Sequence, residues 1–409
     1  MDKNLLYFTN SYPYGIGEQW KKNELDVLVN YFNQITVIPF SYGGNFNQPK
    51  TLPKNVHLET PLYEKEGFFI SKVDWIKILF SRYILIFLTE FFSKKVYLTK
   101  AHLINWAVAC KQVLLLSQHK RLNKILDNAN ENTVLYFFWG KGTCELIPFK
   151  KKLKAKVIAV RLHGYDLYEE RNFGYIPFRN FLFNRVNYLL PISINGANYL
   201  KNNSSEKFLS KINMLRLGTL SNGKQASKST DNVIRITSCS SIIPLKRLHI
   251  MVQSLNYLTV PVEWRHIGDG PLQKEIQLLV EENKLNNQFI FEGFIPSQEI
   301  QNQYTNRNID LFVNTSSTEG VPVSIMEAFA AGIPVLATNV GGTSEIVDDT
   351  VGGLLPADLT PECLAKKIMT FYHLPEIKKE KLRQNAYQRF QEKCDANFWA
   401  NQLGKLLTS

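Results

Sequence analysis

The second half of the chain alternates between two kinds of segment, and this alternation restricts the fold more than any other feature. Buried parallel strands are typically apolar and β-branched. Such runs occur at residues 233–239, 262–267, 289–291, 309–315 and 335–338. A segment with helical periodicity follows each run, and the last of these lies at 343–347. Because neighbouring parallel strands are joined by crossover helices, the alternation predicts a doubly wound parallel sheet.

The first half shows the same kind of pattern, which predicts a second α/β domain. Its apolar runs lie at residues 4–9, 35–39, 133–138, 157–162 and 188–192. Between the halves, the polar, small-residue stretch 218–231 is typical of a linker. We therefore expect domains at 1–217 and 232–376, and a polar helical tail at 377–409 that returns to the N-terminal domain. Two such domains would face a cleft, where ligands bind.

The composition is that of a folded protein, because 44% of the 409 residues are hydrophobic and 21% are charged. The five cysteines are an odd number without a CxxC pair, which favours reduced thiols in a cytoplasmic protein. Neither a DxD pair nor a His/Cys metal-binding spacing occurs, so we expect no metal ion. The N-terminal apolar run is too short for a signal peptide.

The formal net charge of +12 is concentrated in one region. Residues 65–124 contain eleven Lys/Arg against three acids, together with aromatic and aliphatic runs. Lys77, Arg82 and Glu90 interrupt these runs, so a spanning helix is not expected. Two interpretations remain open: the apolar residues face the domain core, or the region docks on an anionic membrane surface. Nucleic-acid binding is less favoured, because no helix-turn-helix, RRM or zinc-finger pattern occurs.

Two carboxylates, Glu319 and Glu327, flank the start of the helix expected after the 309–315 strand. The pattern places Glu319 in the loop and Glu327 about one turn into the helix, at the edge where open α/β sheets bind ligands. A helix N-terminus offers N–H groups to a phosphate, and carboxylates accept hydrogen bonds from hydroxyls. The alternative is that one glutamate caps the helix and the other lies on its solvated face.

Two further strand ends of the second half carry candidate residues. Lys246 and Arg247 follow the 233–239 strand, where two cations are well placed to neutralise a diphosphate. Cations at a helix N-terminus oppose its dipole, which favours a charged ligand over a solvated helix start. Gly268 and Gly270 allow a sharp turn after the 262–267 strand, either as a structural turn or as a ligand contact. Without a third glycine, NAD binding is not expected.

In the first half, His163 follows the 157–162 strand, with Arg161 and Asp166 beside it. An imidazole at a ligand-binding edge is suited to acid/base chemistry or hydrogen bonding, although a single histidine also occurs as a purely structural residue. Gly15 and Gly17 follow the first strand, and glycines allow a ligand to approach the backbone closely. These residues predict a second ligand-facing edge.

Taken together, these segments resemble a family 4 retaining glycosyltransferase of the GT-B fold, over nearly the whole chain. The most specific piece is the E-x7-E segment from Glu319 to Glu327. The supporting pieces, in chain order, are Gly15-Ile-Gly17-Glu18, Arg161-Leu-His163-Gly-Tyr-Asp166, Pro244-Leu-Lys246, Gly268-Asp-Gly-Pro271, Phe291-Glu-Gly-Phe294-Ile-Pro296 and Gly341-Gly342. The resemblance implies two Rossmann-like domains that face a cleft.

The resemblance also implies a role for each candidate. Glu327 would hold the ribose of a UDP- or GDP-sugar and Glu319 would face its sugar, while Lys246 and Arg247 would stabilise the leaving diphosphate. His163 would lie near the donor sugar and the acceptor hydroxyl. Further donor-side positions would be Gly268, Gly270, Phe294, Ile295, Gly320, Val321, Pro322 and Val323. Acceptor-side positions would be Gly15, Gly17, Arg161 and Asp166.

The reaction implied is sugar transfer with retention, without metal or cofactor, onto a glycan or lipid-linked glycan of a cell-surface polysaccharide. One position departs from the family pattern, because Ser240-Ser241 stands where Gly-Arg is common. Either Arg247 supplies the missing charge or donor binding is altered. Two other functions remain open: a nucleotide-sugar epimerase of similar architecture, or a non-catalytic protein that binds sugar nucleotides. The expected location is cytoplasmic, at the inner face of the membrane if the basic region docks there.

Overall fold

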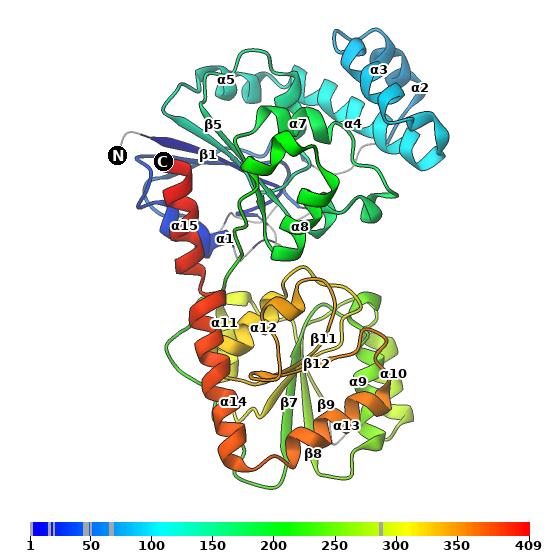
Figure 1. The fold of residues 1–409 in the computed structure, drawn as a ribbon, viewed down its shortest axis with the longest axis vertical. Helices are drawn as coiled ribbons and strands as arrows, with labels where there is room; N and C mark the ends of the chain where they lie inside the picture. Colours follow the sequence, from blue (N-terminus) through cyan, green and yellow to red (C-terminus); the bar gives the residue numbers. More distant parts are fainter. Residues whose placement is uncertain are drawn as a thin grey trace. The chain divides into compact units, whose positions relative to one another are not determined.

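The computed structural model describes residues 3–14, 18, 21–43, 49, 51–64, 69–285 and 289–409. The chain forms two compact units, shown in Figure 1. Unit 1 consists of Met1–Leu215 and Ala400–Ser409, and unit 2 consists of Arg216–Trp399. Each unit is built around one six-stranded parallel sheet. The expected pair of doubly wound α/β domains is therefore confirmed.

The sheet of unit 1 has the order β3-β2-β1-β4-β5-β6, and every pair of neighbours is parallel. The chain moves outward from β1 to β3 and then returns to the centre at β4. A topological switch point therefore lies between β1 and β4, where open α/β sheets place their ligand sites. The strands are β1 (Asn4–Thr9), β2 (Ile35–Pro39), β3 (Val56–Leu58), β4 (Thr133–Phe137), β5 (Val157–Leu162) and β6 (Tyr188–Pro191).

The helices of unit 1 include a long insertion between β3 and β4. They are α1 (Lys21–Leu28), α2 (Lys72–Leu79), α3 (Ile84–Ser93), η1 (Val96–Leu98), α4 (Lys100–Gln118), α5 (Lys120–Asn128), η2 (Thr143–Phe149), α6 (Gly164–Leu167), η3 (Glu169–Asn172), α7 (Arg179–Arg185), α8 (Ile194–Asn203) and η4 (Glu206–Lys211). The insertion has its own small core, in which Phe87 of α3 packs against Trp106 of α4. No helix among the described residues combines the length and apolar character needed to cross a bilayer.

The sheet of unit 2 has the order β12-β11-β10-β7-β8-β9 and repeats the topology of unit 1. Its switch point lies between β7 and β10. The strands are β7 (Ile234–Cys239), β8 (Val262–Ile267), β9 (Phe289–Gly293), β10 (Leu311–Asn314), β11 (Val335–Thr338) and β12 (Gly352–Leu355). The helices are η5 (Pro244–Lys246), α9 (Leu248–Ser254), η6 (Leu255–Tyr257), α10 (Gln273–Glu282), α11 (Ser297–Thr305), α12 (Val323–Ala330), η7 (Thr343–Glu345), α13 (Pro361–Tyr372), α14 (Glu376–Arg389) and η8 (Phe390–Cys394).

Residues 218–231, expected as a linker, pack within unit 2. The N–H of Ala226 donates to the carbonyl of Ala331 at 2.9 Å, and the N–H of Thr219 donates to Cys394 at the same distance. Ala226 is also part of the unit 2 core. The predicted tail is divided between the units. Helix α14 and the first residues of α15 (Ala396–Thr408) belong to unit 2, whereas Ala400–Ser409 belong to unit 1.

Sequence patterning did not predict the last strand of unit 2. The predicted alternation ended at residue 347, but β12 and α13 follow. Gly352 and Gly353 open β12, and glycine carries little strand signal. The structure explains the glycine at 352: a Cβ there would lie 2.1 Å from the carbonyl oxygen of Val335 on β11.

Candidate functional site

The switch point of unit 2 brings together two side chains that lie 73 residues apart in the sequence. Lys246 ends the turn that follows β7, and Glu319 lies in the loop that follows β10. The Nζ of Lys246 donates to Oε1 of Glu319 at 2.7 Å. Their side chains are 23% and 11% exposed, respectively. The pair is therefore partly desolvated but still open to a ligand.

Hydrogen bonds to backbone carbonyls fix the loops that carry this pair. The N–H of Ser317 donates to the carbonyl of Leu245 at 2.8 Å. The hydroxyl of Thr315 donates to the carbonyl of Lys246 at 2.7 Å. On the other side, the hydroxyl of Thr338 at the end of β11 donates to the carbonyl of Ser316. Three neighbouring strand ends thus hold the pair in place.

A small, open pocket lies at the same strand ends. Lys246 lines it, together with hydroxyl-bearing residues such as Ser240 at the end of β7 and Ser316 after β10. Hydroxyl groups and a lysine ammonium are suited to an anionic group such as a phosphate. Ser241, the position that departs from the family pattern, is exposed.

Two glycines outside this loop shape its path. Gly341 has a φ of +56°, and a Cβ at this position would lie 1.9 Å from the carbonyl oxygen of Glu319. Gly342 donates its N–H to the carbonyl of Gly320 at 2.7 Å, and a Cβ there would lie 2.5 Å from the same oxygen. The segment after β11 therefore supports the Glu319 loop from behind, and only glycine leaves room for it.

Arg247 was expected to bind the diphosphate, but its guanidinium is engaged by the protein itself. Its guanidinium donates to three backbone carbonyls: Nε to Thr315 at 2.7 Å, Nη1 to Ala357 at 2.9 Å and Nη2 to Ser316 at 3.1 Å. Arg247 itself is in the left-handed region, with a φ of +49°. It therefore clamps the loops that follow β7, β10 and β12.

Gly268 and Gly270 let the loop after β8 pack against the loop after β7. A Cβ at Gly268 would lie 1.9 Å from the carbonyl oxygen of Ser240, and one at Gly270 would lie 2.5 Å from that of Ile242. The N–H of Ile242 donates to the carbonyl of Asp269 at 2.7 Å. Of the two interpretations left open by the sequence, these contacts support the structural turn.

Glu327 lies in the second turn of α12, 6% exposed. Its Oε1 accepts one long hydrogen bond, 3.4 Å, from the hydroxyl of Ser297 at the start of α11. Burial raises the pKa of the Glu327 carboxyl from 4.5 to about 8, although the Ser297 hydroxyl opposes the shift. A solvated face for Glu327, one of the readings left open, is therefore excluded. A buried carboxyl with so few partners is suited to accept hydrogen bonds from a ligand.

The remaining donor-side candidates surround these glutamates. Phe294, 45% exposed, and Ile295 lie between β9 and α11, and only Pro296 separates them from the Ser297 that contacts Glu327. Gly320 and Val321 lie between Glu319 and the start of α12 at Val323. Pro322 has no N–H, so the backbone donors of this stretch come from the other residues. Gly332, with a φ of +66°, follows α12 and suits the left-handed residue that commonly ends a helix.

In unit 1, His163 follows β5 and its ring is buried among aromatic rings. The ring centroids of Trp139 and Phe138 lie 4.2 and 4.9 Å from that of the imidazole. Oδ2 of Asp166 is 3.7 Å from Nδ1 of the imidazole. Burial lowers the pKa of His163 below its usual value, although Asp166 opposes the shift. The imidazole is therefore neutral near neutral pH.

Asp166 and Arg161 are both interior residues. Oδ2 of Asp166 accepts a hydrogen bond from the N–H of Gly140 at 2.6 Å, which ties the loop after β4 to the loop after β5. Arg161 is fully buried and pairs with Glu24 of α1 at 2.7 Å. Direct contact between Arg161 and an acceptor is therefore not open in this structure, and we assign it to the support of the sheet edge.

Glu18 connects the other loops of this edge, a role that the sequence did not suggest. Its Oε2 accepts from the N–H groups of Ser11 and Tyr12 at 2.9 and 2.8 Å, and its Oε1 accepts from the indole of Trp139 at 2.6 Å. Oε1 also pairs with the fully buried Lys21 of α1. Burial alone would raise the pKa of Glu18, but Lys21 and these hydrogen bonds lower it to about 2.

Trp139 contacts both Glu18 and His163. Sequence reasoning missed Trp139, although its position directly after the apolar run of β4 marks it as a residue of the ligand-binding edge. Gly15 and Gly17, the other acceptor-side candidates, lie outside the described residues. Glu18 follows them and is held at both ends of its carboxylate. Lys21 is likewise missed by sequence reasoning, because a lysine in an amphipathic helix is normally solvated.

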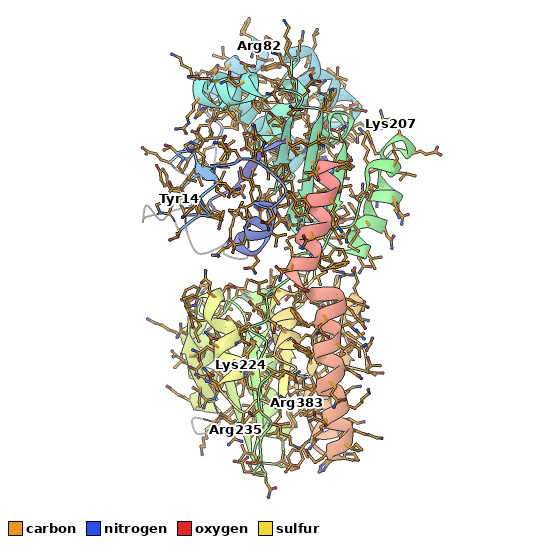
Figure 2. All side chains as sticks on the ribbon, turned by 90° about the vertical axis from the view of Figure 1, so that its left-hand side faces the viewer. Tyr14, Arg82, Lys207, Lys224, Arg235 and Arg383 are labelled. Atoms are coloured by element: carbon orange, nitrogen blue, oxygen red, sulfur yellow. The ribbon has the colours of Figure 1, made fainter. Side chains whose placement is uncertain are left out.

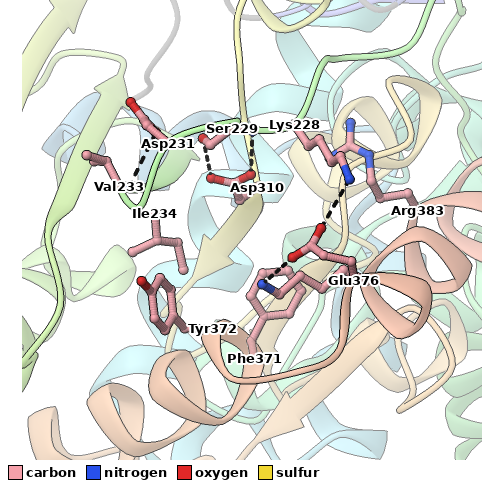
Figure 3. A pocket seen from close by; sticks show the side chains of 11 residues that line it. Lys228, Ser229, Asp231, Val233, Ile234, Asp310, Phe371, Tyr372, Glu376 and Arg383 are labelled. Carbon is pink, nitrogen blue, oxygen red and sulfur yellow. Dashed lines mark hydrogen bonds and ion pairs between the residues drawn. The ribbon is translucent and has the colours of Figure 1, made fainter.

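A larger pocket of about 490 Å³ lies at the opposite edge of the unit 2 sheet (Figure 3). Asp231 and Asp310, which line it, precede β7 and β10 rather than follow them. Three of its charged side chains are paired with each other, because Glu376 binds Lys228 at 3.1 Å and Lys379 at 2.9 Å. Because parallel sheets bind ligands at their carboxyl ends, we place the site at the Lys246–Glu319 edge instead.

The family model of Glycosyl transferases group 1 matches residues 222–389. The chain is 25% identical over 258 residues to the putative colanic acid biosynthesis glycosyltransferase WcaL of Salmonella typhimurium (strain LT2), which covers 61% of this chain and 64% of that protein. It is 26% identical over 225 residues to WcaL of Escherichia coli (strain K12), and this match covers 53% of this chain and 55% of that protein. The chain thus matches less than two thirds of the length of these relatives.

Among solved structures, the whole chain resembles Alr3699/HepE of Anabaena, determined in complex with UDP and glucose. The TM-score is 0.66 and the match covers 99% of each chain, at 16% sequence identity. At this identity the likeness establishes the fold alone. Residues 222–389 therefore match the Glycosyl transferases group 1 family, and the chain as a whole has the GT-B fold.

Proposed function

We propose that this protein is a retaining glycosyltransferase that moves a sugar from a UDP- or GDP-sugar to a glycan or lipid-linked glycan in cell-surface polysaccharide biosynthesis. The observation that carries the proposal is the Lys246–Glu319 contact at the switch point of unit 2, beside a pocket lined by Lys246. The group 1 domain and the colanic acid relatives support the same reaction and pathway class.

In this proposal, the nucleotide lies along the carboxyl edge of unit 2. The ribose hydroxyls donate to Glu327, whose single 3.4 Å hydrogen bond to Ser297 leaves it able to accept more. The base lies against Phe294 and Ile295, which lie three and two residues before that serine. UDP is the first nucleotide to test, because the neighbouring structure of HepE contains it.

When the donor binds, its diphosphate would replace Glu319 as the partner of the Lys246 ammonium. In the free protein Lys246 pairs with Glu319, so the incoming phosphate replaces one anionic partner with another. Glu319 is then released to accept hydrogen bonds from the sugar hydroxyls. Arg247 keeps its three carbonyl partners and maintains the loops, which is a narrower role than direct phosphate binding.

Transfer breaks the bond between the anomeric carbon and the diphosphate oxygen, and forms a bond from that carbon to the acceptor oxygen. The acceptor hydroxyl loses its proton to the departing diphosphate, on the face that the nucleotide leaves, so the configuration is retained. Lys246 and the N–H groups around Gly320 stabilise the charge that develops on the leaving group, in place of a metal ion. His163, neutral near neutral pH, serves as a hydrogen-bonding group for the donor sugar.

The direct test supplies a panel of UDP- and GDP-sugars with lipid-linked glycan acceptors, with and without a metal chelator. We expect acceptor-dependent release of one nucleoside diphosphate, unchanged by chelation, and a product whose anomeric configuration by NMR equals that of the donor. Turnover of the donor without acceptor would instead identify an epimerase. Donor binding without turnover on any acceptor would identify a non-catalytic binding protein.

A further inference from the structure

The insertion between β3 and β4 of unit 1 exposes a concentration of large apolar side chains. Twenty large hydrophobic residues are exposed in the described chain, and nine of them lie between residues 69 and 98. Three are almost entirely in solvent: Phe69 is 92% exposed, Phe80 is 87% and Leu85 is 78%. The others are Val73, Ile76, Leu79, Phe92, Tyr97 and Leu98. Such a concentration is characteristic of an interaction surface.

The exposed residues form stripes along their helices. Val73 and Ile76 of α2 and its C-cap Phe80 are spaced by three and four residues, and therefore lie on one face. On α3, Leu85 and Phe92 are seven residues apart and share a face as well. Figure 1 shows α2 and α3 standing away from the sheet, beyond α4.

These stripes are not a misplaced core, because the opposite faces of the same helices are already packed. Ile78 and Phe87 are fully buried in the small core of the insertion. The indole of Trp106 on α4 donates to the carbonyl of Phe87 at 3.2 Å. Lys111 of α4 pairs with Asp74 of α2 at 2.9 Å. The helices are therefore fixed with their second apolar face outward.

The charge on this surface has a single sign. Both acids of residues 69–100 are buried: Asp74 is engaged by Lys111, and Glu90 accepts from the hydroxyl of Tyr175 and the N–H of Phe178, both at 3.0 Å. All six basic residues of the stretch are exposed, namely Lys72, Lys77, Arg82, Lys94, Lys95 and Lys100. Figure 2 labels Arg82 among the outward-pointing side chains.

We propose that α2, α3 and η1 form a docking surface for an anionic phospholipid bilayer. The apolar stripes enter the boundary between head groups and acyl chains, and the lysine ammonium groups stay at the level of the lipid phosphates. The buried acids matter for this assignment, because no exposed carboxylate of the stretch opposes a uniformly negative surface. Of the two interpretations that the sequence left open, the exposed side chains support the membrane.

The test is flotation of the full chain with vesicles of phosphatidylcholine alone or mixed with phosphatidylglycerol, at low and high salt. One variant changes Lys72, Lys77, Lys94 and Lys95 to Glu, and its control changes Lys366, Lys367, Lys378 and Lys381, four exposed lysines of unit 2, to Glu. The control has the same net charge, so only the location of the charge differs. A second variant, Phe80→Ser with Leu85→Ser, is matched by Leu278→Ser with Ile377→Ser, which are also exposed.

We expect the unaltered protein to float with the anionic vesicles only, and less so at high salt. Since each lysine strengthens binding to such a surface roughly fivefold, the four-lysine variant should lose about 100-fold or more in partitioning, and its control much less. The serine pair on the insertion should lose binding, and its unit 2 match should not. Equal flotation with both vesicle types, or equal losses in variants and controls, would overturn the proposal. So would a concentration-dependent dimer, seen by light scattering, that Phe80→Ser abolishes without any vesicle binding.

This inference does not depend on the proposed transfer reaction. Flotation measures binding without a donor or an acceptor, so a protein that docks on vesicles but transfers no sugar would leave the docking surface standing. Conversely, activity with a water-soluble acceptor in a protein that fails to float would leave the proposed function standing.

Discussion

At the scale of single residues, Glu327 carries the most information. It is buried at a sheet edge where ligands bind, and it has one long hydrogen bond. Buried carboxyls without partners cost stability and persist at sites where a ligand supplies the missing groups. Burial raises the pKa of Glu327 from 4.5 to about 8, so the free-energy cost of burying this carboxylate can be measured from the pH dependence of stability.

The first prediction concerns the stability of Glu327→Gln. Between the unfolded pKa of 4.5 and the folded pKa of about 8, the folded chain holds a proton that the unfolded chain has lost. Stability therefore falls as the pH rises through this window. The amide removes this loss, so we expect urea unfolding of unit 2 at about pH 8.5 to show a gain of about 4–5 kcal/mol, and little change near pH 4.5. A variant less stable than the parent at the higher pH would contradict the assigned burial.

A second residue-scale prediction separates the neighbours Lys246 and Arg247. Lys246→Gln should lower kcat about 10²–10³-fold, as expected for loss of a charged group at the developing diphosphate, and leave stability within about 0.5 kcal/mol. Arg247→Gln leaves backbone carbonyls unpaired and should cost about 1–3 kcal/mol of unfolding free energy. Both variants are compared by steady-state kinetics and urea unfolding. If Arg247→Gln lowered kcat and Lys246→Gln lowered stability instead, the guanidinium would be the group that binds the phosphate.

At the scale of elements, loops that follow different strands hold each other in place. The sequence predicted that Glu319 and Lys246 lie at the same edge of the sheet, because the carboxyl ends of parallel strands meet there. It did not predict that their strands, β10 and β7, are neighbours. It could not predict that Arg247 clamps carbonyls or that Ser297 contacts Glu327, since these contacts depend on loop paths. β12 was missed for a related reason: its glycines are explained only by the nearby backbone of β11.

Gly341→Ala tests the support of the Glu319 loop. Its Cβ would lie 1.9 Å from the carbonyl oxygen of Glu319, so the loop has to move. Gly223→Ala is the matched control, because Gly223 also has a positive φ, +78°, but a Cβ there meets nothing within 4 Å. We expect Gly341→Ala to cost about 1–3 kcal/mol more than its control and to weaken nucleotide binding, measured by urea unfolding and calorimetry. Equal effects of the two substitutions would mean that backbone strain alone matters.

In unit 1, Glu18→Gln tests the connection between α1 and the loops after β1 and β4. The amide can no longer balance the buried ammonium of Lys21, and its NH2 group opposes the donors that Glu18 accepts. We expect a loss of about 3–5 kcal/mol in the unfolding free energy of unit 1. Adding Lys21→Met removes the unpaired charge, so the double variant should regain part of this loss. No recovery in the double variant would show that the ion pair is not the main contribution.

At the scale of the whole molecule, the order and type of most strands followed from the sequence, because buried parallel strands are marked by continuous apolar runs. The sequence did not reveal that residues 218–231 pack within unit 2, since small polar residues read as a linker even where their backbone is bonded. It left open whether residues 65–124 bury their apolar side chains, because helical periodicity does not distinguish a core face from a docking face. The helices of that region turned out to have apolar residues on both faces.

The C-terminal residues 400–409 belong to unit 1, and their packing gives a further prediction. Leu403 and Leu407 are fully buried, and the hydroxyl of Tyr31 donates to the side chain of Asn401 at 2.7 Å. Leu403→Ala should lower the unfolding free energy of unit 1 by about 2–5 kcal/mol. Leu406→Ala, at a half-buried position of the same helix, should cost clearly less. The measurement is urea unfolding monitored separately for each unit. If Leu403→Ala destabilised unit 2 alone, residues 400–409 would not belong to unit 1.

We propose that the carboxyl edge of unit 2 binds a nucleoside diphosphate sugar through Lys246, Glu319 and Glu327. Calorimetric titration of UDP and GDP at about pH 7, in two buffers of different ionisation enthalpy, tests it most directly. Hydroxyl donors favour an ionised carboxylate, so Glu327, with a pKa of about 8 in the free protein, should release a proton as the ribose binds. We predict saturable binding of one of these nucleotides with proton release, weakened in Lys246→Gln and without proton release in Glu327→Gln. Absence of binding by both nucleotides, or binding that neither substitution alters, would contradict the account.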